Sequence, residues 1–298
     1  MDLVDNFVLG AAWPVAQISS ALIAGWSAPG HFQAPIPPAE PLTRRISLLP
    51  DDVANIWPVQ DQGDSMECVA YATVACLELT RYTPGSGFQS LSPDFLYYAI
   101  RCLIPTPNPL PGGWGQGLVM FVNARDALAQ FGICADKDWT GPGATALASA
   151  TTAAAGDKVT SVIVPPGFPI CEMSGSDRVW RLYRELVAGR PVGAAFHGFK
   201  TGNGSINWYD TNDGTVRFGG NDCPHVGGAP PYKGGHAVCI VGFEPDASDN
   251  MGGYFIFRNS LGESWPEKPI DRWPKGYGRI AASDVGRFLW EALFMPAA

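Results

Sequence analysis

The sequence has few charged residues and no long basic run. Charged side chains make up 16% of its 298 residues, against about 25% in an average soluble domain. The formal net charge is −8, and no basic cluster is longer than Arg44-Arg45. This charge balance repels a phosphate backbone on average. The sequence therefore argues against nucleic acid as a partner.

Metal-binding patterns are also missing. The seven cysteines are irregularly spaced, without a Cys-x-x-Cys pair or a Cys/His knuckle, which argues against a structural zinc site. The acidic stretch Asp210-Thr211-Asn212-Asp213-Gly214 lacks the glycine and glutamate positions of a calcium loop and predicts a hairpin turn. We expect no metal and no cofactor. An odd number of cysteines leaves at least one thiol free even if the others pair.

Charge is nearly absent from the N-terminal part. Within residues 7–39 only His31 could carry a charge. Residues 7–26 have about the length of a membrane span, but Pro14 and several polar residues interrupt them. Two aspartates stand where a secretory signal has positive charges. We therefore expect no export signal, and the sequence favours the cytoplasm or a larger assembly over secretion.

A proline-rich connector ends this apolar part. Four prolines between residues 35 and 41 predict a stiff, extended segment of the polyproline type. We expect a boundary near residue 43, so that residues 1–43 form an apolar extension: a tether, a docking arm or a short mask. A protein partner for this extension is favoured over a membrane. Residues 44–298 then form the globular domain.

The globular part begins with helical patterns and continues with strand patterns. Apolar residues at three-and-four spacing predict a helix over 65–81, and Ser92-Pro93 is typical of a helix start. The order of helices before strands favours an α+β layout, with a helical lobe at about 50–155 and a β-rich lobe at about 156–298. Further helices are expected over 119–130 and 177–188, and strands over 192–196, 237–243, 254–258 and 277–281.

One cysteine stands where a thiol is easily activated. Cys68 lies near the start of the first predicted helix, where the helix dipole favours a thiolate. Nucleophilic catalysis by cysteine also needs an imidazole within hydrogen-bond reach. His236 begins an apolar strand pattern, Asn259 ends another, and Gln62 lies six residues before Cys68. Taken alone, Cys68 fits a small buried side chain and His236 a packed histidine; together they indicate a nucleophilic site.

These residues stand in recognisable surroundings. Asp61-Gln62-Gly63 followed by Cys68-Val69-Ala70-Tyr71-Ala72 resembles the active-site region of papain-like cysteine peptidases. The resemblance covers roughly residues 44–290, with the pieces in the family's order. The other matching pieces are Leu91-Ser92-Pro93, Gln130-Phe131-Gly132-Ile133, His236-Ala237-Val238, Val241-Gly242-Phe243, Asn259-Ser260, Gly262, Trp265 and Gly276-Tyr277-Gly278-Arg279-Ile280.

The resemblance implies a fold and a reaction. The fold would be α+β with two lobes, a helical lobe and an antiparallel β-barrel-like lobe, and with a peptide or protein substrate in the cleft between them. Cys68 would be the nucleophile and His236 the general base, then the acid toward the leaving amine. Asn259 would orient the imidazole. The Gln62 amide and the Cys68 backbone N–H would form the oxyanion hole, and the reaction would be hydrolysis of peptide bonds.

Substrate-binding residues are implied in the same way. The glycine-rich stretch with Gly112, Gly113 and Gly115 resembles the cleft wall that hydrogen-bonds the substrate backbone in this family. Trp265 belongs to the family's closing pattern and is taken as a further substrate-binding residue. Substrate preference does not follow from these positions.

The chain departs from the family pattern around the nucleophile. Ser65-Met66-Glu67 replaces the usual Cys-Gly-Ser, so the disulfide tied to that position is absent, which fits a reducing compartment or a divergent branch of the family. Glu67 brings a carboxylate beside Cys68 and would raise the pKa of the thiol unless it points away. Val69 stands where a tryptophan is usual, and Leu261 replaces the tryptophan that shields the Asn–His hydrogen bond. These departures bear on catalytic efficiency.

Two alternatives to a peptidase remain open. A non-catalytic papain-fold component of a larger assembly would use the same fold to bind a partner. A transamidase or deamidase would keep Cys68 and His236 but transfer the acyl group differently. Reactivity of the Cys68 thiol separates the first alternative from an enzyme, and an added amine acceptor would expose the second.

Overall fold

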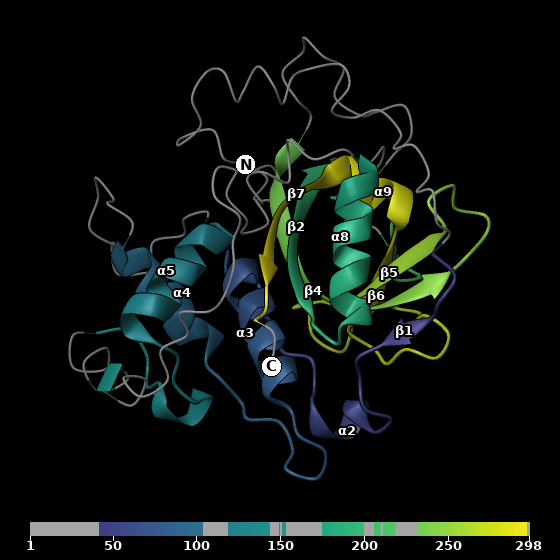
Figure 1. Ribbon diagram of the computed structural model, residues 1–298. Helices are drawn as coiled ribbons and strands as arrows, with labels where there is room; N and C mark the ends of the chain where they lie inside the picture. The colour runs from purple at the N-terminus through teal and green to yellow at the C-terminus, as the bar shows by residue number, and fades with distance from the viewer. Residues whose placement is uncertain are drawn as a thin grey trace.

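The structure is a computed structural model, and it describes residues 42–103, 119–143, 149, 151–152, 175–199, 206–209, 211–218 and 232–296. Figure 1 shows a group of helices beside a strongly twisted sheet, with one helix between the two. This arrangement confirms the predicted α+β class with a helical and a β-rich lobe. No helix among the described ranges combines the length and apolar character needed to cross a membrane.

The helical part is built around α3 (Cys68–Arg81), α4 (Pro93–Leu103) and α5 (Phe121–Phe131). The predicted start of α4 is confirmed, because the Phe95 backbone N–H donates to Ser92 Oγ at 3.2 Å. α5 ends at Gly132, whose φ of 81° suits glycine. Two short helices flank these three in the chain. α2 (Val53–Ile56) precedes α3, and a 3₁₀ helix (Asp136–Asp138) follows α5.

The first long helix begins three residues later than its sequence pattern predicts. α3 starts at Cys68 and not at residue 65. The preceding segment is held in a turn, because Gln62 Nε2 donates to the Ser65 backbone oxygen at 2.6 Å and the Gln62 backbone N–H donates to the Ser260 oxygen at 2.8 Å. These tertiary bonds override the helical periodicity and place Cys68 at the helix N-terminus.

The described sheet has seven strands, in the order β3-β6-β5-β4-β2-β7, with β1 also paired to β4. All pairings are antiparallel except the short β3–β6 pairing, so the expected antiparallel lobe is mixed at this edge. The strands are β1 (Ile46–Ser47), β2 (Val192–Phe199), β3 (Thr215–Val216), β4 (Tyr232–Pro245), β5 (Gly253–Arg258), β6 (Tyr277–Ala281) and β7 (Leu289–Phe294).

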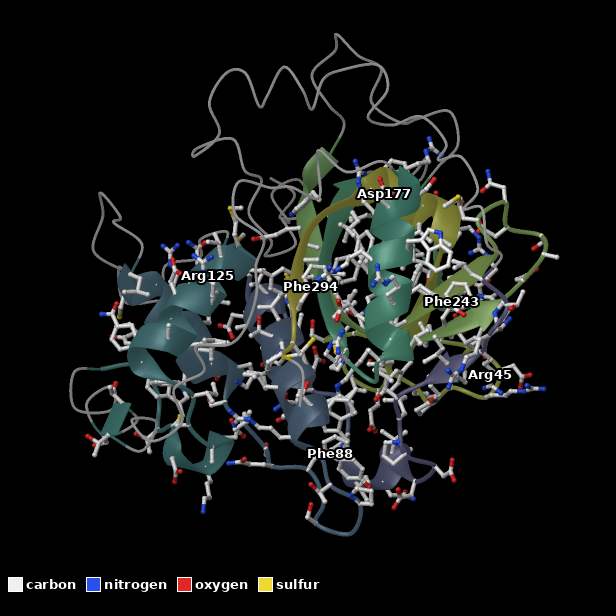
Figure 2. All side chains as sticks on the ribbon, in the orientation of Figure 1. Arg45, Phe88, Arg125, Asp177, Phe243 and Phe294 are labelled. Atoms are coloured by element: carbon white, nitrogen blue, oxygen red, sulfur yellow. The ribbon has the colours of Figure 1, made fainter. Side chains whose placement is uncertain are left out.

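The two faces of the sheet are covered by different helices. α8 (Gly175–Val187) and α9 (Ala282–Phe288) pack on one face and contact each other. Phe243 of β4 and Phe294 of β7 lie on either side of α8 in Figure 2 and belong to the same core cluster. On the other face α3 packs against β4 and β2, and it also contacts α4 and α5 (Figure 1). Eleven of its fourteen residues are buried, so α3 is the centre of the molecule.

Close packing fixes the strand that carries His236. Gly235 precedes it in β4, opposite His197 in the register of β2. A Cβ at Gly235 would overlap the ring of Trp290 and approach the Phe196 backbone oxygen. Only glycine therefore fits at this position, and the strand cannot slide against its neighbours without a clash.

Candidate active site

Cys68 lies at the junction of α3 and β4. It is the first residue of α3 and has no exposed surface. The Ala237 backbone N–H donates to Cys68 Sγ at 3.4 Å. The first N–H groups of a helix have no intrahelical acceptor and carry partial positive charge. The sulfur is therefore held where a negative charge on it would be stabilised from both elements.

His236, the residue before Ala237, pairs with Asn259. The distance from His236 Nε2 to Asn259 Oδ1 is 2.7 Å, and both side chains are buried. Asn259 Oδ1 also accepts the Ser260 backbone N–H at 2.9 Å. A carbonyl oxygen only accepts hydrogen bonds, so Nε2 is the ring nitrogen that carries the proton of the neutral imidazole. The lone pair is then on Nδ1.

The second ring nitrogen is free to take a proton. His236 Nδ1 is buried and has no hydrogen-bond partner among the described residues. Burial lowers the pKa of His236 to about 4, against a smaller upward effect of the hydrogen bond to Asn259. The imidazole is therefore neutral at pH 7 and has the protonation state of a base.

An aromatic ring covers this imidazole. The Trp208 ring lies 4.7 Å from the His236 ring between centroids, edge to face at 61°. Leu261, which stands where the family has the shielding tryptophan, is buried at 8% exposure, and Trp208 makes the ring contact with His236. Trp208 was not among the residues predicted from the sequence. Its only signal is an aromatic pair, Trp208-Tyr209, in a polar, glycine-rich region.

Gln62 is joined to the segment that carries Asn259. The Ser260 hydroxyl donates to Gln62 Oε1 at 2.5 Å, and the Gln62 backbone N–H donates to the Ser260 oxygen. An isolated antiparallel bridge between Asp61 and Leu261 extends this contact. The side-chain amide has two hydrogens, and one of them is used by the Ser65 oxygen. The structure thus links all four predicted catalytic residues through Ser260 and Ala237.

The carboxyl group of Glu67 turns toward α4. Burial, the charge of Asp94 and a side-chain hydrogen bond to Asp94 raise the pKa of Glu67 to about 8. The Tyr71 hydroxyl also donates to Asp94 Oδ1, at 3.4 Å. Glu67 is therefore mostly protonated at pH 7. The full negative charge that the sequence places beside Cys68 is absent under these conditions.

The predicted substrate-binding residues are less well placed. Trp265 is 8% exposed, and its ring lies 5.9 Å from that of Phe257. Gly112, Gly113 and Gly115 lie outside the described residues. Their roles stay predictions.

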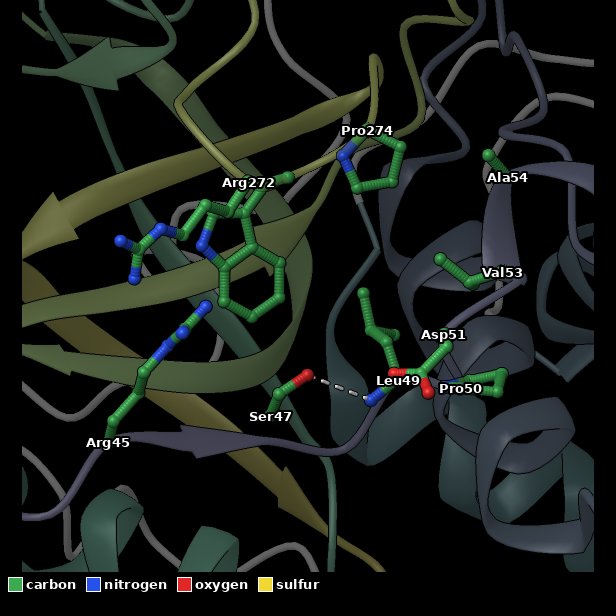
Figure 3. Close-up of a pocket in the computed structure, with 10 residues that line it drawn as sticks. Arg45, Ser47, Leu49, Pro50, Asp51, Val53, Ala54, Arg272 and Pro274 are labelled. Atoms are coloured by element: carbon green, nitrogen blue, oxygen red, sulfur yellow. Dashed lines mark hydrogen bonds between the residues drawn. The ribbon is translucent and has the colours of Figure 1, made fainter.

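A cavity of about 480 Å³ opens elsewhere on the molecule. It lies between β1, α2 and the segment with Arg272, and Figure 3 shows Arg45, Ser47 and Leu49 along its wall. None of the four predicted catalytic residues lines it. Within the described ranges, no group of three or more His, Cys, Asp or Glu side chains is arranged to hold a metal ion. The polar network around Cys68 is therefore the candidate site.

No protein-family model matches the sequence, and no curated protein is similar to it at a significant level. Solved structures do match. Xylellain, a cysteine protease from Xylella fastidiosa, is 18% identical with a TM-score of 0.57 over 100% of this chain and 94% of that one. Digestive procathepsin L 3 of Tenebrio molitor is 17% identical with a TM-score of 0.56 over 97% and 82%.

The bromelain protease from Ananas comosus is 18% identical with a TM-score of 0.51, over 86% of this chain and 100% of that one. At these identities the likeness concerns the fold, and it spans most of each chain in all three cases. The predicted fold is confirmed: this chain has the papain-like fold of cysteine proteases.

Proposed function

We propose that the protein is a cysteine peptidase that hydrolyses peptide bonds with Cys68, His236 and Asn259. One observation carries the proposal: the chain of contacts in which Asn259 holds His236 and the next residue, Ala237, holds the Cys68 sulfur. A buried thiol at a helix N-terminus beside an oriented neutral imidazole is the arrangement that nucleophilic catalysis requires. A structural histidine does not need an unpaired ring nitrogen.

In the first step Cys68 Sγ attacks the carbonyl carbon of the scissile peptide bond. The thiol proton passes to His236 Nδ1, whose lone pair is set by the Nε2 hydrogen bond to Asn259. The N-terminal dipole of α3 and the Ala237 N–H stabilise the charge that develops on sulfur. A C–S bond forms and the carbonyl oxygen becomes an oxyanion.

The oxyanion needs donors that are already in place. The Cys68 backbone N–H is one candidate, because it belongs to the first residue of α3, where the helix N-terminus carries partial positive charge. The second Nε2 hydrogen of Gln62 is the other, and Ser260 fixes the amide in place. Donors of this kind contribute about 3 kcal/mol each to transition-state stabilisation.

The second half of the reaction uses the same imidazole. Protonated His236 donates its Nδ1 proton to the leaving amine, the C–N bond breaks, and a thioester to Cys68 remains. Water then attacks the thioester carbon and gives a proton to Nδ1. The C–S bond breaks, the carboxylic acid leaves, and the Cys68 sulfur takes the proton back from Nδ1. The pKa of His236, about 4, favours rapid transfer of the Nδ1 proton to the leaving amine once the imidazole has been protonated.

Two cysteine proteases with this fold were solved with a bound inhibitor, which supports a peptide substrate for this protein. The bromelain protease was solved with the E64 inhibitor, and so was a Carica candamarcensis cysteine protease. E64 labelling of this protein, followed by intact mass and peptide mapping, therefore tests the proposal. We expect one adduct, on Cys68, and none in Cys68→Ala. Cys76→Ala, which removes another buried thiol of α3, should be labelled like the wild type.

The outcomes separate the alternatives. No adduct on a folded protein, verified by circular dichroism, would contradict the enzyme and favour a non-catalytic binding component. An adduct together with amide products in the presence of an added amine would favour a transamidase. An adduct together with free carboxylic acid products supports the peptidase.

The extension can be tested in the same assay. The proposal for residues 1–43 is a tether, a docking arm or a mask, and the deletion should end before Leu42 because this side chain is buried in the core. Faster E64 labelling after deletion of residues 1–41 would identify a mask. An unchanged rate would leave a tether or an arm.

A further inference from the structure

A second pair of reactive groups joins α3 to β4. Cys76 Sγ and Cys239 Sγ lie 3.2 Å apart, and neither side chain has any exposed surface. Both are free thiols. Cys76 is in α3 and Cys239 is in β4, where it stands opposite Gly193 of β2 and Arg258 of β5. The pair therefore spans the boundary between the central helix and the sheet.

The separation is short enough for a covalent bond. A disulfide has sulfur atoms about 2.05 Å apart, so the two atoms must approach by only about 1 Å. Rotation about the Cα–Cβ bond of each cysteine is the movement that would bring the two sulfurs together. Both cysteines belong to the same core cluster, and a disulfide has no hydrogen-bond donor that burial would leave unpaired.

We propose that Cys76 and Cys239 form a disulfide that fastens α3 to β4 when the chain meets a small-molecule disulfide such as oxidised glutathione. Cys239 as thiolate attacks one sulfur of oxidised glutathione, forming a mixed disulfide and releasing one reduced glutathione. Cys76 as thiolate then attacks the Cys239 sulfur and releases the second. Overall, two protein thiols are oxidised to one disulfide, and one oxidised glutathione is reduced to two glutathione molecules.

The folded, reduced protein resists this reaction. Burial and the neighbouring Cys239 thiol raise the pKa of Cys76 well above its ordinary value, and the thiolate is the reacting form. Glutathione also has no path to two fully buried atoms. The bond therefore forms during folding or when α3 separates from β4, and the same burial then protects it from reductants.

The proposal is independent of catalysis. It rests on the contact between two thiols that the proposed reaction does not use, so it stands even if Cys68 is not a nucleophile. For the same reason the test uses the full chain with Cys68→Ala, which removes a competing reactive thiol. Failure of E64 labelling and failure of this test are separate results.

The experiment is refolding from urea in reduced and oxidised glutathione, compared with refolding in dithiothreitol. Non-reducing peptide mapping should find a peptide that joins Cys76 to Cys239, and the intact mass should fall by about two units for that bond. Because the bond closes a very long loop, the melting temperature should rise by roughly 5–10 °C and return after reduction. Cys134→Ala, another buried cysteine, should keep the shift.

Two results would overturn the proposal. The first is a folded, oxidised protein in which Cys76 and Cys239 are both alkylated by iodoacetamide after unfolding in denaturant. The second is a melting-temperature rise that persists in Cys76→Ala or Cys239→Ala. The alkylation result needs no variant, so the proposal stays testable even if a cysteine substitution prevents folding.

Discussion

Two of the contacts between the helix α3 and the strand β4 each contain a buried thiol of the helix. At the N-terminal point Cys68 accepts a backbone N–H from Ala237, beside His236 and its hydrogen bond to Asn259. Two turns further along the helix, the sulfur of Cys76 contacts the sulfur of another thiol, Cys239. Both cysteines are 0% exposed, so exposure does not distinguish them.

The difference lies in the polar groups around each sulfur. Cys68 has the free end of the helix and a base within one residue of its contact, whereas Cys76 is inside the helix among apolar side chains. A buried thiol without such groups has a raised pKa and is inert. One helix thus presents a site suited to nucleophilic attack and a site suited to a structural cross-link.

The largest effect should come from replacing Cys68 and Cys76 with alanine in two separate variants. We expect Cys68→Ala to lower kcat for peptide hydrolysis by on the order of 10⁴-fold or more, since the nucleophile is lost. Cys76→Ala should keep kcat within about twofold and destabilise the fold by about 1 kcal/mol. Peptide hydrolysis and urea unfolding measure both. Equal losses of activity would remove the distinction between the two contacts.

The second-largest effect on kcat should come from replacing Gln62, the proposed oxyanion donor. Gln62→Ala should lower kcat by about 10²- to 10³-fold with little change in KM, because the interaction is made mainly in the transition state. Gln60→Ala, two residues earlier, is the matched control and should be near wild type. A Gln62 effect confined to KM would contradict an oxyanion role.

Glu67, the residue before Cys68, should make the stability of the protein depend on pH. Its pKa is raised from an ordinary 4.5 to about 8, so the folded state binds more protons than the unfolded state between these values, and stability falls as pH rises through this window. We expect Glu67→Gln to remove on the order of 2 kcal/mol of the stability loss between pH 5 and pH 8. Urea unfolding at several pH values measures this.

The exposed Glu263→Gln is the control for charge alone and should leave the pH dependence of stability unchanged. A Glu67→Gln protein with the wild-type slope would mean that Glu67 is ionised in the folded state. Its charge would then act directly on Cys68.

The smallest effect should come from the cover over the imidazole. Trp208→Leu should admit water to His236, raise its pKa from about 4 toward 6.5, and shift the acid limb of the kcat/KM profile to higher pH. We expect kcat to fall by about fivefold to tenfold. Trp180→Leu, on α8, should leave the acid limb in place. An unmoved limb in Trp208→Leu would show that the ring does not control the imidazole.

Much of this architecture could be predicted from local patterns. The start of α4 matches its predicted position, and α5, β5 and β6 match their predicted ranges closely, because caps, glycines and apolar periodicity act within a few residues. Cys68, His236, Asn259 and Gln62 were identified from motifs, and the structure links them. Their chemical roles are still proposals.

The parts that were missed depend on distant contacts. β7 follows α9 without a turn residue, and its central Glu291 is buried, accepting the Phe121 and Val122 backbone N–H groups at 2.9 and 3.0 Å. A charged residue in a strand interior gives no local sign of such a partner. Trp208 was missed for the same reason, since its contact with His236 exists only in the folded chain.

The pairing of β1 with β4 joins segments that are far apart in the chain, and such pairings affect the order in which the protein folds. Ile46 is in register with Phe243, and α3 packs against β2 and β4, strands that come more than a hundred residues later in the chain. Such contacts slow folding because long loops must close first. While the chain is being synthesised, α3 therefore has no sheet to cover it, and both the contact of Cys68 with Ala237 and the contact of Cys76 with Cys239 form only when β4 has been made.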